Sequence, residues 1–198
     1  MKIGILGGSF NTVHKGHLVI ASSAMEQFAL NKVVFVPALV SPHKQGEVDL
    51  LNPKHRYAMV QLAIKGLKDF EVSDIELKRG GISYTIDTIE FFLKEYPGAK
   101  LFLILGADSF SKISTWRSAE KIKSLCHVLI APRPGEDVST IADMENYQKI
   151  NLTECPISAS AIRKKIASGE PVPSSELPES VSKYISEQRL YKKSMPCR

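Results

Sequence analysis

Cysteine is scarce in this chain, and its spacing excludes small cross-linked domains. The 198 residues include three cysteines, Cys126, Cys155 and Cys197, which lie far apart and form no CxxC pair. An odd number of widely spaced cysteines indicates neither a disulfide framework nor a zinc site. The pattern fits a reducing compartment, so we expect a cytoplasmic protein.

Long hydrophobic runs are missing as well. The longest are residues 33–40, interrupted by Pro37, and residues 101–105. Both are far shorter than the roughly 20 residues that a membrane-spanning helix needs. The apolar start at 1–6 runs directly into Gly7 and Gly8, which makes it too short for a signal peptide. We therefore expect neither a membrane span nor export.

Charge of one sign is not concentrated anywhere. The chain has 26 Lys and Arg against 21 Asp and Glu, a formal net charge of +5. A dedicated nucleic-acid binder usually shows a denser basic stripe with interleaved aromatic residues. The mild excess is compatible with anionic small-molecule substrates, without nucleic acid or membrane as a partner. A homo-oligomer is left open.

The chain does contain a repeated alternation of short apolar strands and amphipathic helices. Hydrophobic residues make up 43% and charged residues 24%, as is usual for a globular domain. Periodicity predicts strands at 2–6, 33–36, 70–77, 101–105, 128–131 and, weakly, 149–152. It predicts helices at 16–28, 53–67, 85–96 and 158–167, and a last one containing Val181, Tyr184 and Ile185.

This alternation predicts an α/β fold, namely a Rossmann-like doubly wound parallel sheet with helices on both faces. We expect a single domain over residues 1–198, with a small C-terminal helical part at about 157–191. In such folds the ligand lies beyond the carboxyl ends of the strands, at the point where the strand order reverses.

The densest group of chemically useful residues lies at 7–17, between the first predicted strand and helix. Glycines let a backbone approach a phosphate closely, and a helix N-terminus offers unpaired N–H groups. His14 and His17, three residues apart, could both point toward one anion. The dinucleotide fingerprint GxGxxG, the Walker pattern and the metal signature HExxH are all absent. Two solvent-facing histidines remain the alternative.

A second group, ISASAIRKK at 157–165, again places hydroxyls and positive charge at a predicted helix start. Ser158 or Ser160 could simply cap that helix. Arg163, one turn into the helix, points back toward its start. A hydroxyl, unpaired N–H groups and an arginine in this arrangement could hold a polyphosphate.

Together, HxGH at 14–17 and ISxSxIR at 157–163 resemble the nucleotidylyltransferase superfamily, and within it the bacterial nicotinate-mononucleotide adenylyltransferases. The resemblance extends over nearly the whole chain. Ser41-Pro42-His43-Lys44 is similar to the PHK loop of that family, 52–64 to its PxxRxxM helix, 76–88 to its ELxRxGxSYTxDT segment and 106–116 to its GAD…W segment.

The sequence departs from the family pattern at two places. The first loop of the family usually reads GG[TS]FDPxHxGH, whereas Asn11 and Thr12 stand here in place of the Asp-Pro pair. This change removes one negative charge and one fixed φ angle. Ile82 stands where the family often has proline. Neither departure changes the histidines or Arg163.

The resemblance implies adenylyl transfer in NAD biosynthesis. The phosphate of nicotinate mononucleotide would attack the α-phosphorus of ATP in line, without a covalent enzyme intermediate. Because the attacking phosphate is already an anion, the protein has to align two anions and stabilise charge rather than supply a nucleophile. We expect Mg²⁺ to be held mainly by the ATP phosphates and water, since no carboxylate cluster for it is visible, and we assign no metal ligand.

The resemblance also assigns residues to these roles. The catalytic residues would be His14, His17, Lys44 and Arg163. The same histidines and Arg163 would bind ATP, together with Gly7, Gly8, Ser9, Phe10, Gly106, Asp108, Arg133, Ile157, Ser158 and Ser160. Nicotinate mononucleotide would contact Lys44, Tyr84, Thr85 and Trp116.

Some of these residues also have plainer explanations. Lys44 could be a solvated surface lysine, Trp116 an ordinary core residue and Asp108 the N-cap of a helix after Gly106. Two other functions stay open. One is nucleotidyl transfer to another phosphorylated acceptor such as phosphopantetheine, against which the SYTIDT segment argues. The other is nucleotide binding without catalysis.

Overall fold

The structure, a computed structural model, describes residues 1–42, 50–132, 146–152 and 156–192. Its strands are β1 (Lys2–Gly8), β2 (Lys32–Pro37), β3 (Phe70–Val72), β4 (Lys100–Gly106), β5 (His127–Ala131) and β6 (Tyr147–Lys149). Its helices are α1 (Lys15–Gln27), α2 (Pro53–Ile64), α3 (Ile75–Arg79), α4 (Thr85–Glu95), α5 (Ala107–Phe110), α6 (Ala119–Leu125), α7 (Ala159–Ser168) and α8 (Glu179–Glu187). A short 3₁₀ helix occupies Ile113–Thr115.

The six strands form one parallel sheet in the order β3-β2-β1-β4-β5-β6. In the central strand, Ile5 pairs with Val34 of β2 on one side and with Leu103 of β4 on the other. The chain builds the sheet outward from β1 to β3 and then returns to β4. The strand order therefore reverses between β1 and β4, which confirms the predicted doubly wound sheet.

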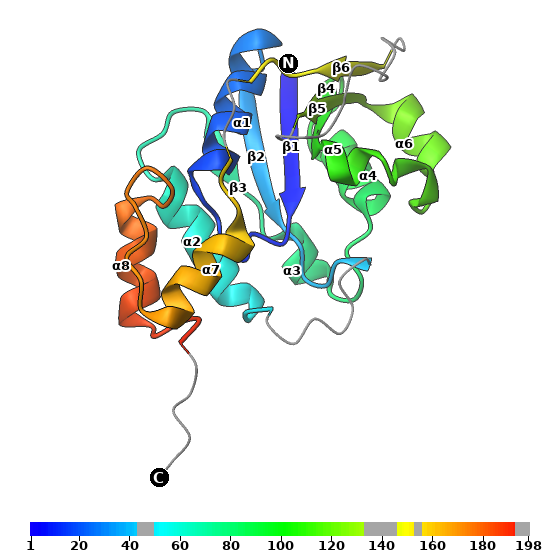
Figure 1. The fold of residues 1–198 in the computed structure, drawn as a ribbon. Coiled ribbons are helices and arrows are strands. Elements are labelled where there is room, and N and C mark those ends of the chain that lie inside the picture. Colours follow the sequence, from blue (N-terminus) through cyan, green and yellow to red (C-terminus); the bar gives the residue numbers. More distant parts are fainter. Residues whose placement is uncertain (43–49, 133–145, 153–155, 193–198) are drawn as a thin grey trace.

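Successive residues of the four central strands, β2, β1, β4 and β5, face two separate hydrophobic layers, as the two-residue repeat of a strand requires. Leu6, Phe35 and Ile104 belong to the layer that also contains residues of α1, α2, α7 and α8. Ile5 and Val34 belong to the layer that contains residues of α4 and α6. Figure 1 shows these two groups of helices on opposite sides of the sheet. Burial on both faces explains why these four strands read as nearly continuous apolar runs.

Three predicted boundaries were wrong. The strand expected at 70–77 ends at Val72, and Ile75 begins helix α3 instead. Helix α2 ends at Ile64, so Leu67 lies outside it and is 43% exposed rather than on the buried face. The last strand occupies 147–149 rather than 149–152. In each case a short apolar stretch continued past the point where the backbone changes direction.

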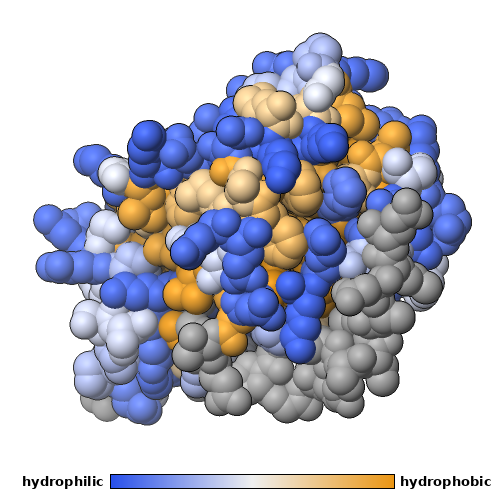
Figure 2. All heavy atoms as spheres, turned by 90° about the horizontal axis from the view of Figure 1, so that it is seen from above, coloured by the Kyte–Doolittle hydropathy of each residue, from blue (hydrophilic) through white to orange (hydrophobic). Residues whose placement is uncertain are grey.

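In the parts of the chain that the structure describes, no helix is both long and apolar enough to cross a bilayer. Figure 2 shows the face at the amino ends of the strands, where hydrophobic side chains lie between hydrophilic ones. The candidate site lies at the opposite end, beyond the carboxyl ends of the strands.

Candidate active site

The loop after β1 lies at the point where the strand order reverses. β1 ends at Gly8, and the chain reaches the start of α1 six residues later, at His14. Within this loop Phe10 is buried and adopts a left-handed backbone, with φ of 47°. Non-glycine residues rarely adopt this conformation and often do so at functional sites. The ring of Phe10 lies edge-on to His17, with 5.1 Å between ring centroids.

The two histidines lie against each other at the start of α1. Their ring centroids are 3.8 Å apart. The backbone N–H of His14, the N-cap residue, donates to Nδ1 of His17 over 3.2 Å. A nitrogen that accepts a hydrogen bond carries no proton, so a neutral His17 holds its proton on Nε2. The backbone thus determines which nitrogen of His17 can donate.

The second motif meets the first loop directly. Arg163 of α7 donates a hydrogen bond from Nη1 to the backbone carbonyl of Asn11. Gly16 shows how close the two segments are, since a Cβ there would lie 3.0 Å from the ring of His14 and 3.5 Å from Cβ of Ile157. A side chain at this position of HxGH would therefore push the ring of His14 away by a few tenths of an ångström. Figure 1 shows α7 beside the carboxyl end of β1.

The serines lie at the start of α7, as predicted. Ser158 is the N-cap residue, but its side chain makes no capping hydrogen bond to the helix. Its Oγ instead lies 2.8 Å from Oγ of Ser160, and both residues are exposed. Capping therefore explains the position of Ser158 but not the contacts of its hydroxyl.

A cavity of about 580 Å³ borders the end of β1 and the start of the first loop. Its lining includes seven residues predicted for the two substrates: Gly7, Gly8, Ser9, Tyr84, Thr85, Asp108 and Trp116. The histidines and Arg163 do not line it. Because Gly7, Gly8 and Ser9 do, the end of β1 and the first loop connect the cavity to the histidines along the chain.

The structure also decides between explanations for two residues of this cavity. The N-cap of α5 is Gly106, so the proposal that Asp108 caps this helix was wrong, and Asp108 lies in the first turn of the helix. Trp116 is half-buried, packs against the hydrophobic layer and lines the cavity. It is thus both a core residue and part of the cavity wall.

Sequence reasoning missed Arg56, whose side chain is fully buried. It donates from Nη1 to the carbonyl of Ser9 over 2.7 Å, from Nη2 to that of Leu39 over 3.1 Å and from Nε to that of Leu51 over 3.0 Å. Burial lowers the pKa of this guanidinium. The three bonds hold the first loop and both ends of the segment between β2 and α2. The PxxRxxM match contained the signal, but no chemistry had been attached to it.

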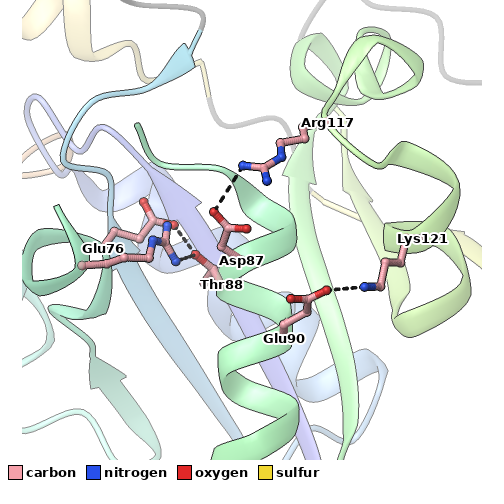
Figure 3. Close-up of polar contacts among 7 residues, drawn as sticks. Glu76, Asp87, Thr88, Glu90, Arg117 and Lys121 are labelled. Carbon is pink, nitrogen blue, oxygen red and sulfur yellow. Dashed lines mark hydrogen bonds and ion pairs between the residues drawn. The ribbon is translucent and has the colours of Figure 1, made fainter. Parts of the chain in front are cut away.

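Two further polar groups form the cavity wall on the side of α4, and Figure 3 shows both. Glu76 is buried and accepts a hydrogen bond of 2.6 Å from Oγ1 of Thr88. Burial raises the pKa of the Glu76 carboxyl, and the hydroxyls of Thr88 and Ser83 partly offset that rise. The guanidinium of Arg117 lies 4.7 Å from the centre of the Tyr84 ring.

Known proteins resemble this chain over nearly its whole length. A family model described as cytidylyltransferase-like matches residues 5–165. A probable nicotinate-nucleotide adenylyltransferase of Desulfitobacterium hafniense is 40% identical, with 96% of each chain covered. Another of the same description, from a Thermoanaerobacter species, is also 40% identical and covers 98% of this chain and 95% of its own. The chain belongs to the nicotinate-nucleotide adenylyltransferase family. It is therefore a nucleotidyltransferase.

A solved structure shares the fold of this family member. The Plasmodium falciparum nicotinic acid mononucleotide adenylyltransferase complexed with NaAD has a TM-score of 0.81 and is 20% identical, with 96% of this chain and 97% of that chain covered. At this identity the likeness concerns the fold.

The departure at Asn11 is accommodated by hydrogen bonds. Oδ1 of Asn11 accepts from the hydroxyl of Tyr191 over 3.0 Å and from the backbone N–H of Leu51 over 3.4 Å. Burial raises the pKa of Tyr191 further above neutral pH, so this hydroxyl stays a donor even in alkaline solution. The amide thus connects the first loop to the C-terminal part of the chain without the negative charge that the family usually has there.

Some predictions lie outside the described residues. Both Lys44 and Arg133 fall in segments that the structure does not describe. Among the residues that it does describe, no group of three or more His, Cys, Asp or Glu side chains is placed to hold a metal ion.

Proposed function

We propose that this chain transfers the adenylyl group of ATP to nicotinate mononucleotide, forming nicotinate adenine dinucleotide and pyrophosphate. The observation that carries the proposal is the position of the first loop. Gly7, Gly8 and Ser9 border a cavity large enough for a mononucleotide, while the same loop leads into His14 and contacts Arg163. One short segment can therefore align an acceptor on one side with polyphosphate on the other.

The reaction needs alignment more than it needs a reactive side chain. An oxygen of the mononucleotide phosphate forms a bond to the α-phosphorus of ATP while the bond from that phosphorus to the bridging oxygen breaks. Pyrophosphate leaves with that electron pair, in line with the attacking oxygen. No proton has to be removed from the attacking phosphate. Holding two anions in this geometry, and stabilising the charge that develops, is the work of the protein.

His17 would act on the transferred phosphoryl group. Because its Nδ1 accepts from the backbone of His14, its Nε2–H is the donor that a neutral ring offers to an α-phosphate oxygen. His14 would contact the same phosphates from the adjacent ring. Ser158, Ser160 and Arg163 would hold the β- and γ-phosphates and the departing pyrophosphate, and Ile157 would line this side. Lys44 would approach from the segment between β2 and α2.

Magnesium would enter with ATP. The described residues offer no cluster of acidic or histidine side chains, so the phosphates and water would supply most of its ligands. Bound there, the ion would offset the part of the negative phosphate charge that His17 and Arg163 do not stabilise.

The cavity would receive the mononucleotide and border the adenosine. Tyr84 and Trp116 would stack on the pyridine ring, and N–H groups near Thr85, at the start of α4, would bind its carboxylate. Gly106 and Asp108 would contact the ribose of ATP, Phe10 would support the phosphate loop, and Arg133 would lie against the adenine.

Pyrophosphate release tests this function. The protein is mixed with ATP, Mg²⁺ and, in separate reactions, nicotinate mononucleotide, nicotinamide mononucleotide or phosphopantetheine. We expect release with the first, and a kcat/KM at least about tenfold above that of the amide, because an unpaired contact at the carboxylate site costs about 1–3 kcal/mol. Equal constants for acid and amide would contradict the assignment of Tyr84, Thr85 and Trp116. No release with any acceptor would indicate nucleotide binding without catalysis.

A further inference from the structure

The cavity has a positive charge beside the start of α4. Lys112 and Arg117 are the cations among its described lining residues. Arg117 follows Trp116 directly, and its guanidinium lies over the ring of Tyr84, the N-cap residue of α4. The guanidinium, the aromatic ring and the first residues of α4 therefore belong to the same part of the cavity wall. Sequence reasoning assigned no role to Arg117.

The present partner of this guanidinium is held loosely. Nη1 of Arg117 lies 3.8 Å from Oδ2 of Asp87, which is too far for a hydrogen bond. A second ion pair between α4 and the segment after it is closer, because Nζ of Lys121 in α6 lies 2.5 Å from Oε1 of Glu90 in α4. Figure 3 shows the two pairs one turn apart. The side chain of Arg117 is 57% exposed, so it can exchange the Asp87 carboxylate for another anion without unfolding its surroundings.

We propose that Arg117 is a specificity-determining residue, whose guanidinium favours the mononucleotide that carries a ring carboxylate over the one that carries an amide. This inference rests on the proposed function. The two mononucleotides have the same ribose and phosphate and differ by one negative charge on the ring substituent. A cation near that substituent attracts the acid and leaves the amide almost unaffected. Asp87 competes with the substrate for the same cation.

Steady-state kinetics with both mononucleotides at saturating ATP provide the test. The quantity measured is the ratio of kcat/KM for the acid to that for the amide. Arg117→Gln should lower this ratio about three- to tenfold, mainly by raising KM for the acid, because a half-exposed charge pair contributes modestly. Arg117→Lys keeps the charge and should retain most of the ratio. Asp87→Asn removes the competing carboxylate and should raise the ratio.

Lys121→Gln is the matched control. It removes the same charge and breaks the pair with Glu90 on the same helix, but Lys121 is not among the residues that line the cavity. We expect it to leave the ratio unchanged. All four variants change exposed or half-exposed side chains, so thermal unfolding should stay close to that of the wild type and show that each is folded.

Two results would overturn this inference alone. An unchanged ratio in Arg117→Gln would mean that this arginine forms only a surface ion pair. Equal losses for acid and amide would mean that it contacts a part that both share, such as the phosphate. A wild-type protein that turns over neither mononucleotide would overturn the proposed function as well, so the two failures are distinguishable.

Discussion

At the scale of single residues, the backbone orients the ring of His17, the donor that we propose for the transferred phosphoryl group. Phe10 supports the ring of His17 from one side, and the N–H of His14 occupies its Nδ1. A donor that is already oriented needs no reorganisation when charge develops on the phosphoryl group. The contribution of His17 should therefore appear in turnover more than in substrate binding.

His17→Ala should lower kcat by about 10²–10³-fold, which is typical for the loss of one donor to a transition state. The free energy of unfolding should fall by no more than about 1 kcal/mol, because one partly exposed hydrogen bond is lost. Lys15→Ala, which changes an exposed side chain between the two histidines, is the control and should keep near-normal turnover. Near-normal turnover in His17→Ala would show that His17 only helps to begin α1.

Glu76 leads to a prediction about pH. Burial raises its pKa in the folded state. At pH values between the ordinary and the raised pKa, the folded protein therefore keeps a proton that the unfolded chain has released. Stability should therefore fall as pH rises from the ordinary glutamate pKa through the raised one, and stay lowered above it.

Glu76→Gln removes this charge while a carbonyl oxygen can still accept from Thr88. In thermal unfolding at a series of pH values, the variant should be more stable than the wild type at neutral pH. The difference should disappear near pH 4, an ordinary value for a glutamate. A difference that does not vary with pH would show that Glu76 has the same pKa in the folded and the unfolded state.

The residues that sequence reasoning found are those whose chemistry depends on near neighbours. His14, Gly16 and His17 could be recognised because residues three positions apart at a helix start can point toward the same ligand. Arg56 was matched only as a letter of PxxRxxM, because two of its three carbonyl partners, those of Ser9 and Leu39, are 47 and 17 residues away. Arg117 carries no local pattern, and its contacts with Tyr84 and Asp87 depend on how α4 lies against the segment at 117. Asp108 was wrongly proposed as the N-cap of α5, because the sequence does not fix where this short helix begins. The N-cap is Gly106, two residues earlier.

At the scale of elements, α7 matters because it presents Arg163 to the first loop. Its guanidinium donates to the carbonyl of Asn11, a residue 152 positions earlier in the sequence. Ile162, the neighbouring residue, anchors the helix in the hydrophobic layer. The same turn of α7 therefore both anchors the helix in the core and directs Arg163 toward the first loop.

Arg163→Ala should raise KM for ATP and lower kcat, because hydrogen bonds to phosphate and to the first loop are both lost. Lys164→Ala is the matched control, since Lys164 is the next residue of α7 and is exposed. It should leave ATP kinetics unchanged. If both variants behave like the wild type, the ISASAIR segment would have no role beyond forming the helix.

Arg56 connects three segments, and its removal should affect stability and activity together. Arg56→Met keeps much of the buried volume but leaves three carbonyls without this donor. We expect the free energy of unfolding, from chemical denaturation, to fall by about 2–4 kcal/mol and kcat/KM to fall as well. Lys54→Ala, an exposed change in the first turn of the same helix, should do neither. Unchanged stability in Arg56→Met would contradict the role of these bonds.

Elements with a strong apolar repeat could be predicted, and those without one could not. β1, β2, β4 and β5 were found because strands buried on both faces are nearly all apolar. Helices α3 and α6 were missed, and α5 was expected only as a helix that Asp108 could cap, because each spans two turns or fewer, too short for a helical repeat to emerge. Their positions are decided by packing, as for Ala119 and Ile122 of α6 in the core.

At the scale of the whole molecule, the strand order brings the two proposed substrate regions together. Because the order reverses between β1 and β4, the loops after these two strands diverge to opposite sides and leave space for a ligand. The alternation of strands and helices predicted this architecture, although the pairing of β1 with β4 joins segments about a hundred residues apart. Oligomeric state, location in the cell and the absence of a nucleic-acid partner stay predictions.

A crystal structure of this protein with nicotinate adenine dinucleotide bound would show whether the two candidate regions form one site. We expect the pyridine ring in the cavity between Tyr84 and Trp116, and the adenylyl phosphate beside the first loop within hydrogen-bonding distance of Nε2 of His17. A dinucleotide whose pyridine ring lies outside this cavity, or whose phosphates lie away from His17 and Arg163, would contradict it.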